Sequence, residues 1–458
     1  MKNIILNTDS YKASHYLQYP PKSEYVSSYI EARGGDYDKT LFFGLQAFIK
    51  EYLLKPITQA DIDEAEAIIT AHGLPFNKEG WQYILDSYNG YLPLEISAVE
   101  EGTLVPLKSP LLQVVNTDPK VPWLTSYLET ALLRAIWYPT TVATLSYSIK
   151  EIIRDYLEAT SENVEEQLPF KLHDFGARGV SSEESAMLGG MAHLVNFQGT
   201  DTLSAIVGAK RYYGADMAGF SIPASEHSTM TSWQREGERD AYANMIKQFG
   251  GEGKIFAVVS DSYDIYNAVS NIWGKELKEQ VKQSGATVVI RPDSGEPKEI
   301  VLEVIKRVYE AFGGYKNSKG YIVLDDSVRI IQGDGVDKEA IKEILDALKN
   351  EGFSAENIAF GMGGNLLQNV GRDDFRFAMK ASAICVDGKW RDVYKDPITD
   401  SGKRSKRGRL ALTRDFETVR VEELGERENL LKPVFRDGKL LKEYTFDEVR
   451  KNINYGEI

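Results

Sequence analysis

The feature that most restricts the fold of this chain is a series of short apolar runs in its second half. They lie at 256–259, 287–290, 328–331 and 358–360. Short, mainly apolar runs of this length predict strands buried on both faces, as in a parallel sheet. Helical patterns separate them, so the order of elements predicts an α/β fold. A parallel barrel and an open doubly wound sheet both fit this order.

Two of the intervening helices have clear sequence signals. The segment 337–350 carries an apolar stripe at i, i+3, i+4 and i+7 spacing, formed by Ile341, Ile344, Leu345 and Leu348. Pro297 stands where the preceding helix is expected to begin, because proline is well tolerated in the first helical turn. The stripe of that helix is Val301, Val304, Ile305 and Val308. Each stripe predicts a helix that packs by one face.

Polar or glycine-rich residues follow each apolar run. The turns read SDSYD at 260–264, RPDSG at 291–295, GDG at 333–335 and GMGG at 361–364. The carboxyl ends of parallel strands share one edge, and barrels and open α/β sheets bind their ligands there. One such turn is also an ordinary helix cap. Four in succession favour a binding site.

The chemistry of these turns fits a phosphorylated sugar. The glycines at 361–364 precede a helix expected to start at Asn365, so their backbone N–H groups can bind a phosphate. Asp293 and Asp334 can accept hydrogen bonds from ribose hydroxyls, and Arg291 can donate to phosphate or carbonyl oxygens. Carboxylates beside phosphates also predict Mg²⁺, without assigning its ligands.

The part before residue 165 has a different order of predicted helices and strands. Helical patterns at 58–71 and 123–138 mix with a strand-like run at 94–99, which predicts an α+β region. A chain of 458 residues exceeds the size of a single core, so two domains are expected. No apolar run approaches the roughly 20 residues of a membrane span, and the amino terminus lacks a signal-peptide pattern. A cytoplasmic protein is expected.

Net charge and the reactive side chains limit the function classes further. The formal net charge of −14 argues against nucleic acids or anionic membranes as partners. The single cysteine, Cys385, lies in an apolar run and is expected to be an inert core thiol. His193 is expected to pack in the core, whereas His227, beside Glu226, can act as nucleophile or base or merely fix its loop. The basic run at 403–409 fits a solvated loop, a phosphate clamp or a patch resembling a nuclear-localisation signal.

Motifs spread along the chain resemble the nicotinamide phosphoribosyltransferase family. They are TDSYK at 8–12, HDFG at 173–176, NFQGTDT at 196–202, EHST at 226–229, SDSYD at 260–264, IRPDSG at 290–295, QGDG at 332–335 and KRSK at 403–406. The resemblance implies a type II phosphoribosyltransferase-like α/β barrel at 165–375 and an α+β domain built from 1–164 and 376–458. It also implies a homodimer, in which each barrel site receives residues from the other domain of the partner.

The resemblance assigns roles to residues around a pyridine ring. Phe175 and the partner's Tyr11 would sandwich the ring, which suits a flat aromatic substrate. Asp201 would accept a hydrogen bond from the carboxamide NH₂, and Arg178 and Arg291 would line the same pocket. An ionised Asp201 would repel the carboxylate of nicotinate, so nicotinamide is the expected substrate.

The resemblance also assigns the groups that hold a phosphoribosyl diphosphate. Asp293 and Asp334 match ribose-hydroxyl binders, and Asp9 in the first motif is expected to bind substrate as well. The 5-phosphate cradle matches Gly333, Gly363 and Gly364. The basic residues expected to reach phosphate or pyrophosphate, several of them across the dimer, are Arg372, Lys380, Lys395 and Lys403.

The implied reaction joins nicotinamide to 5-phosphoribosyl 1-diphosphate, gives nicotinamide mononucleotide and pyrophosphate, and begins NAD salvage. Arg291, Asp293 and Asp334 would orient the sugar as positive charge builds on it, with Mg²⁺ at the leaving pyrophosphate. His227 matches the residue that relatives phosphorylate from ATP. A nicotinate phosphoribosyltransferase is the nearest alternative. A sugar-phosphate barrel isomerase or aldolase, and a non-catalytic protein on the same scaffold, are more distant ones.

Overall fold

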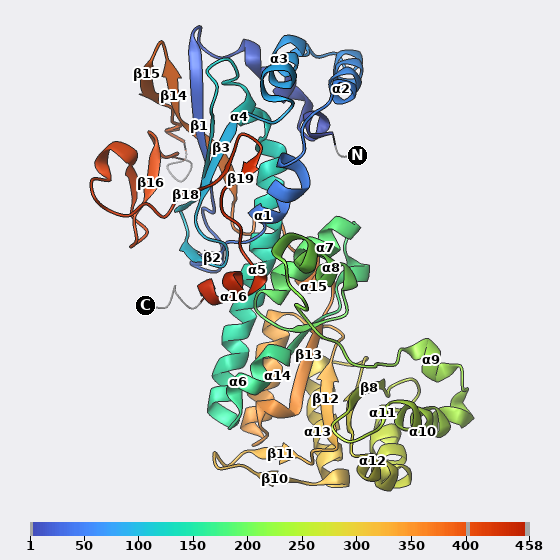
Figure 1. The fold of residues 1–458 in the computed structure, drawn as a ribbon. Helices are drawn as coiled ribbons and strands as arrows, with labels where there is room; N and C mark the ends of the chain where they lie inside the picture. Colours follow the sequence, from blue (N-terminus) through green and yellow to red (C-terminus); the bar gives the residue numbers. More distant parts are fainter. Residues whose placement is uncertain (1–2, 400–403, 454–458) are drawn as a thin grey trace. The chain divides into compact units, whose positions relative to one another are not determined.

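The structure is a computed structural model that describes residues 3–399 and 404–453 (Figure 1). The chain forms two compact units. Unit 1 comprises Met1–Thr144, Gly208–Asp216 and Val370–Ile458, and unit 2 comprises Leu145–Val207 and Met217–Asn369. One boundary therefore lies inside helix α5 (Glu129–Thr160) and another inside helix α8 (Leu203–Tyr213), where no local sequence signal marks it. The domain limits expected from the sequence stay a prediction.

Unit 1 is built on an antiparallel sheet with the strand order β15-β14-β1-β5-β3-β18-β19. These strands are β1 (Ser23–Glu31), β3 (Leu94–Ala98), β5 (Pro110–Asn116), β14 (Ala378–Val386), β15 (Lys389–Asp392), β18 (Lys432–Arg436) and β19 (Lys439–Leu440). Short antiparallel pairs join β2 (Lys39–Leu41) to β4 (Leu104–Pro106) and β16 (Leu410–Leu412) to β17 (Thr418–Arg420). The helices are α1 (Leu45–Phe48), α2 (Gln59–Ala71), α3 (Lys78–Tyr88), α4 (Leu124–Tyr127) and α16 (Phe446–Asn452). The expected α+β region is confirmed.

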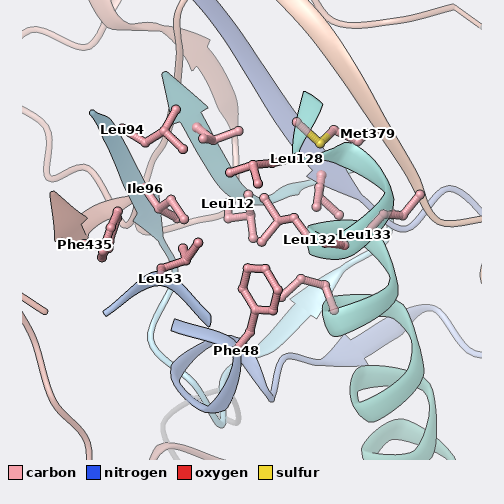
Figure 2. Packing of buried hydrophobic residues seen from close by; sticks show 14 of the residues in the cluster. Phe48, Leu53, Leu94, Ile96, Leu112, Leu128, Leu132, Leu133, Met379 and Phe435 are labelled. Carbon is pink, nitrogen blue, oxygen red and sulfur yellow. The ribbon is translucent and has the colours of Figure 1, made fainter. Parts of the chain in front are cut away.

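The core of unit 1 forms between one face of this sheet and the first turns of α5. Ile96 on β3 and Leu112 on β5 pack with Leu132 on α5 (Figure 2). All three side chains are inaccessible to solvent. Successive side chains of a strand point to opposite faces, and β3 accordingly alternates between buried and half-buried residues.

The helix expected at 123–138 is wrong in its extent. Helix α4 ends at Tyr127, and α5 then runs through Pro139 to Thr160. Proline removes a helical hydrogen bond, so a local pattern ends beside it. Fully buried residues beyond the proline, such as Val142, keep one face of the helix packed. Tertiary burial therefore outweighs the local signal.

Unit 2 is built on a curled parallel sheet with the strand order β7-β6-β13-β12-β9-β8. These strands are β6 (Leu172–Asp174), β7 (Gly199–Thr200), β8 (Ile255–Val259), β9 (Thr287–Arg291), β12 (Val328–Gln332) and β13 (Ile358–Met362). The strands predicted from the apolar runs are confirmed as β8, β9, β12 and β13. A separate hairpin pairs β10 (Gly314–Lys316) with β11 (Ile322–Leu324).

Helices connect the parallel strands of unit 2 (Figure 1). They include α6 (Val164–Gln167), α7 (Glu183–Leu194), α9 (His227–Thr231), α10 (Glu238–Phe249), α11 (Ile265–Asn267), α12 (Lys278–Ser284), α13 (Pro297–Phe312), α14 (Lys338–Asn350) and α15 (Gly364–Leu367). Pro297 is the first residue of α13, as predicted, and the predicted stripes of α13 and α14 are buried. The expected helix near Asn365 is the single turn α15.

Cys385 and the long helices were also the subject of predictions from the sequence. Cys385 is buried, and burial together with the nearby Glu24 carboxylate raises the pKa of its thiol. An inert core thiol fits this environment. Within the described residues, no helix is both long and apolar enough to cross a membrane.

Lys171 is a buried cation at the amino-terminal end of β6. Its Nζ donates a hydrogen bond of 2.8 Å to the carbonyl of Glu356. Burial lowers the pKa of Lys171 to about 7, the nearby Arg329 acts in the same direction, and Glu356 opposes them. The unfolded chain keeps this proton up to its ordinary pKa near 10.5.

Lys171→Met should remove a pH dependence of stability. Between about pH 7 and 10.5 the unfolded chain binds more protons at position 171 than the folded chain, so this lysine makes stability rise with pH. The unfolding free energy of the parent minus that of the variant should increase by about 2 kcal/mol from pH 7 to 9. Urea unfolding at both values measures it, with the exposed Lys298→Met as control. Equal pH dependence in the parent and Lys171→Met would contradict the assignment.

Candidate active site

The carboxyl ends of the parallel strands bring most of the predicted site residues of unit 2 to one edge of its sheet. In spatial order, the residues that end or follow the strands are Asp201 after β7, Phe175 after β6, Gly363 after β13, Gly333 after β12, Asp293 after β9 and Asp261 after β8. The aromatic ring and Asp201 thus belong to one end of the edge. The glycines lie in the middle, and the carboxylates of Asp261 and Asp293 lie at the other end.

Phe175 has a defined position at this edge. Its backbone N–H donates to the carbonyl of Met362 at 3.0 Å. Its ring covers Gly361, where an added Cβ would lie only 1.9 Å from Phe175 Cε2. The guanidinium carbon of Arg291 lies 5.5 Å from the ring centroid. Gly361 is therefore required to admit the ring, and one face of the ring has a cation nearby.

Asp201 lies at the same end of the edge as Phe175 and has two donors. His173 Nε2 is 2.8 Å from Asp201 Oδ1, and Ser221 Oγ donates to the same oxygen at 2.5 Å. Partial burial alone would raise the pKa of Asp201, but these hydrogen bonds and the positive charge of Arg291 outweigh it and lower the pKa. Asp201 is therefore ionised at neutral pH. The sequence did not reveal His173 or Ser221 as its partners.

His227 belongs to a network of charges at the opposite end of the edge. Its Nε2 is 2.9 Å from Asp261 Oδ1, and its Nδ1 is 3.9 Å from Asp293 Oδ2. Arg291 donates two hydrogen bonds to Asp293 Oδ1, at 2.8 and 2.6 Å. Asp261 Oδ2 accepts from Ser294 Oγ at 2.5 Å and from the backbone N–H of Asp293 at 3.1 Å. Asp261 belongs to the SDSYD motif at 260–264, but the sequence alone indicates no role for it.

The glycine turns between these two ends leave open space. An added Cβ at Gly364 would meet no heavy atom within 4 Å, and one at Gly363 would meet only the Phe175 carbonyl at 3.7 Å. Arg178 is exposed in the short turn Ala177–Gly179, and an added Cβ at Gly179 would lie 3.2 Å from Gly364 Cα. The turn that carries Arg178 therefore packs against the glycine turn.

The turn after β12 is stabilised by a buried side chain. Gln332 is fully buried, and its Nε2 donates to the carbonyl of Asp334 at 2.8 Å. Asp334 itself is exposed to solvent. This arrangement leaves the Asp334 carboxylate available to a ligand.

The remaining predicted residues lie in unit 1. Asp9 Oδ2 accepts a hydrogen bond of 2.7 Å from Thr130. Tyr11 is 56% exposed, so its side chain is accessible to a ligand. Arg372 and Lys395 are exposed, whereas Lys403 lies outside the described residues.

Lys380 lies on β14 among other cations. Partial burial lowers the pKa of Lys380, with contributions from Arg33, Lys395 and Lys12, while Glu129 opposes them. Lys12 forms an ion pair with Glu129. The buried Nη2 of Arg33 has no hydrogen-bond partner within the described part of the chain. Positive charge is thus concentrated here, which favours an anionic ligand.

Arg33 and Lys12 were missed as members of this cluster. Arg33 Nε pairs with Glu31 at 3.0 Å, and Glu31 also binds Lys406 at 2.7 Å. The described arginines of the basic run also pair with carboxylates: Arg404 and Arg407 with Asp396, and Arg409 with Glu422. Much of that run is therefore neutralised within the chain.

The described residues contain no group of three or more His, Cys, Asp or Glu side chains arranged to hold a metal ion. Both oxygens of Asp261 already accept hydrogen bonds. One oxygen of Asp293 is occupied by Arg291. A metal that enters this edge therefore needs ligands from a substrate and from water.

Two solved structures of named enzymes have a similar fold. A nicotinate-nucleotide pyrophosphorylase from Pyrococcus furiosus matches with a TM-score of 0.63 and 17% identity, over 99% of this chain and 95% of that one. Human nicotinic acid phosphoribosyltransferase matches with a TM-score of 0.54 and 17% identity, over 98% and 93%. At these identities the likeness shows the fold, and the expected type II phosphoribosyltransferase-like architecture is confirmed.

Sequence comparisons are more specific. Residues 170–439 match the nicotinate phosphoribosyltransferase (NAPRTase) family, and residues 3–96 match the nicotinamide phosphoribosyltransferase amino-terminal domain. A nicotinamide phosphoribosyltransferase from Xanthomonas campestris is 55% identical over 98% of both chains. One from Acinetobacter baylyi is 33% identical over 97% of this chain and 96% of its own. The chain therefore belongs to the nicotinate phosphoribosyltransferase family and, within it, to the nicotinamide phosphoribosyltransferases.

Proposed function

We propose that this enzyme transfers the phosphoribosyl group of 5-phosphoribosyl 1-diphosphate to the ring nitrogen of nicotinamide. The products are nicotinamide mononucleotide and pyrophosphate, at the start of NAD salvage. The observation that carries the proposal is the ionised Asp201, whose partner His173 lies with its ring centroid 5.0 Å from that of Phe175. A carboxylate accepts a hydrogen bond from an amide NH₂ and repels a second carboxylate, which disfavours nicotinate.

The rest of the edge fits the sugar and its phosphate. The aromatic face of Phe175 binds the pyridine ring, and Arg178 and Arg291 contact amide and phosphate oxygens. Asp293 and Asp334 accept hydrogen bonds from the ribose hydroxyls and favour the positive charge that builds at the anomeric carbon. The open backbone at Gly333, Gly363 and Gly364 admits the 5-phosphate. Alignment of the two reactants supplies much of the catalysis.

Pyrophosphate departure needs positive charge. We assign this role to Arg372, Lys380, Lys395 and Lys403, with Arg33 beside Lys380. Mg²⁺ would be held by diphosphate oxygens and water, and would neutralise charge on the leaving group. The proposal includes a homodimer, so that the partner's Tyr11 stacks on the ring, and a cytoplasmic location. Sedimentation equilibrium tests the dimer, and cell fractionation tests the location.

One assay tests the reaction itself. The purified protein receives phosphoribosyl diphosphate and Mg²⁺ with either nicotinamide or nicotinate, with and without ATP, and the mononucleotide formed is quantified. Product from nicotinamide supports the proposal. Product from nicotinate alone would overturn the role of Asp201 and favour the nicotinate alternative. No product from either base would refute the transferase.

Asp201→Asn should lower the preference for nicotinamide over nicotinate by about 100-fold, because the repelling charge is replaced by a neutral amide. The measurement is kcat/KM for each base in the variant and in the parent. Asp326→Asn, whose side chain is 90% exposed away from this edge, is the control. An unchanged ratio in Asp201→Asn would show that charge at position 201 does not select the base.

A further inference from the structure

The donors around Asp201 are distributed unevenly over its two oxygens. His173 Nε2 and Ser221 Oγ both approach Oδ1, at 2.8 and 2.5 Å. Within the described ranges, Oδ2 accepts no hydrogen bond. His173 is the less exposed partner, at 14% against 47% for Asp201. One oxygen is thus anchored to the protein, and the other stays available to a ligand.

The His173 ring is itself held in place by the sheet. Gly199 pairs with His173 across β6 and β7, and an added Cβ at Gly199 would lie only 2.7 Å from His173 Nδ1. The centroids of the His173 and Phe175 rings are 5.0 Å apart. His173 therefore contacts both the proposed stacking ring and the proposed amide acceptor, and Gly199 provides the space that it occupies.

We propose that His173 and Ser221 are positioning residues that select nicotinamide by fixing Asp201 through Oδ1, so that Oδ2 alone accepts from the carboxamide NH₂. The inference rests on the proposed function. Two donors on one oxygen restrict rotation of the carboxylate, and hydrogen bonds to a carboxylate favour its ionised form. A fixed, negatively charged Oδ2 accepts a hydrogen bond from the carboxamide NH₂ of nicotinamide, whereas it repels the carboxylate of nicotinate.

A matched pair of substitutions separates the hydrogen bond from the space that the ring fills. In His173→Gln the terminal nitrogen is as many bonds from the backbone as Nε2 is in histidine, so a donor remains. His173→Leu removes the donor and keeps an apolar side chain. The leucine variant should raise KM for nicotinamide about tenfold and lower the nicotinamide-to-nicotinate ratio of kcat/KM about tenfold, the usual size of one hydrogen bond to a charged group. The glutamine variant should restore most of the parental KM for nicotinamide and most of the parental nicotinamide-to-nicotinate ratio of kcat/KM.

Two further readouts distinguish positioning from general damage. KM for phosphoribosyl diphosphate should stay at the parental value, because the contacts of His173 are at the opposite end of the edge from Asp293. Ser221→Ala should shift the base preference in the same direction as His173→Leu. Gly199→Ala should do so as well, because it displaces the His173 ring and leaves the imidazole intact. These two variants decide the question even where His173→Leu fails to fold.

The exposed His72→Leu, in unit 1, serves as the control and should keep the parental preference. Parental KM and preference in both Ser221→Ala and Gly199→Ala would overturn the inference. Equal losses with both bases, without a change in preference, would also overturn it and leave His173 a structural role. The failure of the proposed function is distinguishable, because the parent enzyme would then form no nicotinamide mononucleotide in the same assay.

Discussion

Gly361→Ala should lower kcat for nicotinamide mononucleotide formation by about 100-fold, the cost of misplacing a reactant by about 1 Å. The added methyl would lie 1.9 Å from Phe175 Cε2, so the ring must leave its position over β13. Nicotinamide would lose its stacking surface and its alignment with the sugar. Overpacking should also lower the unfolding free energy by about 1–3 kcal/mol.

Gly364→Ala provides the contrast. Its added methyl meets no protein atom within 4 Å, so stability should stay at the parental value. It projects into space assigned to the 5-phosphate, so KM for phosphoribosyl diphosphate should rise. Phe175→Leu combined with Gly361→Ala should lose less stability than the sum of the single changes, because the smaller side chain relieves the clash. Additive losses would show that Phe175 is not what Gly361 accommodates.

The strands of unit 2 were predictable because their signal is local. Each of β8, β9, β12 and β13 is a short, mainly apolar run that is followed by a polar or glycine-rich turn. The short strands β6 and β7 carry no such run, and they join the sheet only through pairing with β13 and with each other. Helix α5 is the opposite case. The local sequence pattern predicts that the helix ends beside Pro139, but buried residues beyond the proline keep it packed and it extends to Thr160.

The site was predictable in its residue types and less so in its contacts. Asp261 and His227 are 34 positions apart, and Asp201 is 28 positions from His173. Such distances leave no periodic signal in a single sequence. Gly361 is a comparable case, because a glycine in a strand predicts close approach of another group without naming it. In the structure, the group that approaches Gly361 is the Phe175 ring. Arg33 follows β1, and the pairing of β1 with β14 brings it near Lys380.

His227→Asn should abolish stimulation of the reaction by ATP and leave the rate without ATP near the parental value. In the step that we propose from the family resemblance, the lone pair of His227 Nδ1 attacks the γ-phosphorus of ATP, the bond from that phosphorus to the β,γ-bridging oxygen breaks, and ADP leaves. Nε2–H, which donates to Asp261 at 2.9 Å, stays protonated, and Asp261 stabilises the positive charge that forms on the ring. Asparagine cannot accept the phosphoryl group.

Asp261→Asn tests the partner in the same step. It keeps the side-chain volume and removes the negative charge, so phosphorylation of His227 should slow by about 100-fold, a typical contribution of a group that assists proton or charge transfer. Acid-labile, base-stable label from γ-labelled ATP measures this step directly, with Asp326→Asn as the control for a lost surface charge. Full label in His227→Asn would place the phosphoryl group elsewhere. Full label in Asp261→Asn, with none in His227→Asn, would keep the phosphohistidine and remove Asp261 from the step, so that the hydrogen bond between them only orients the ring.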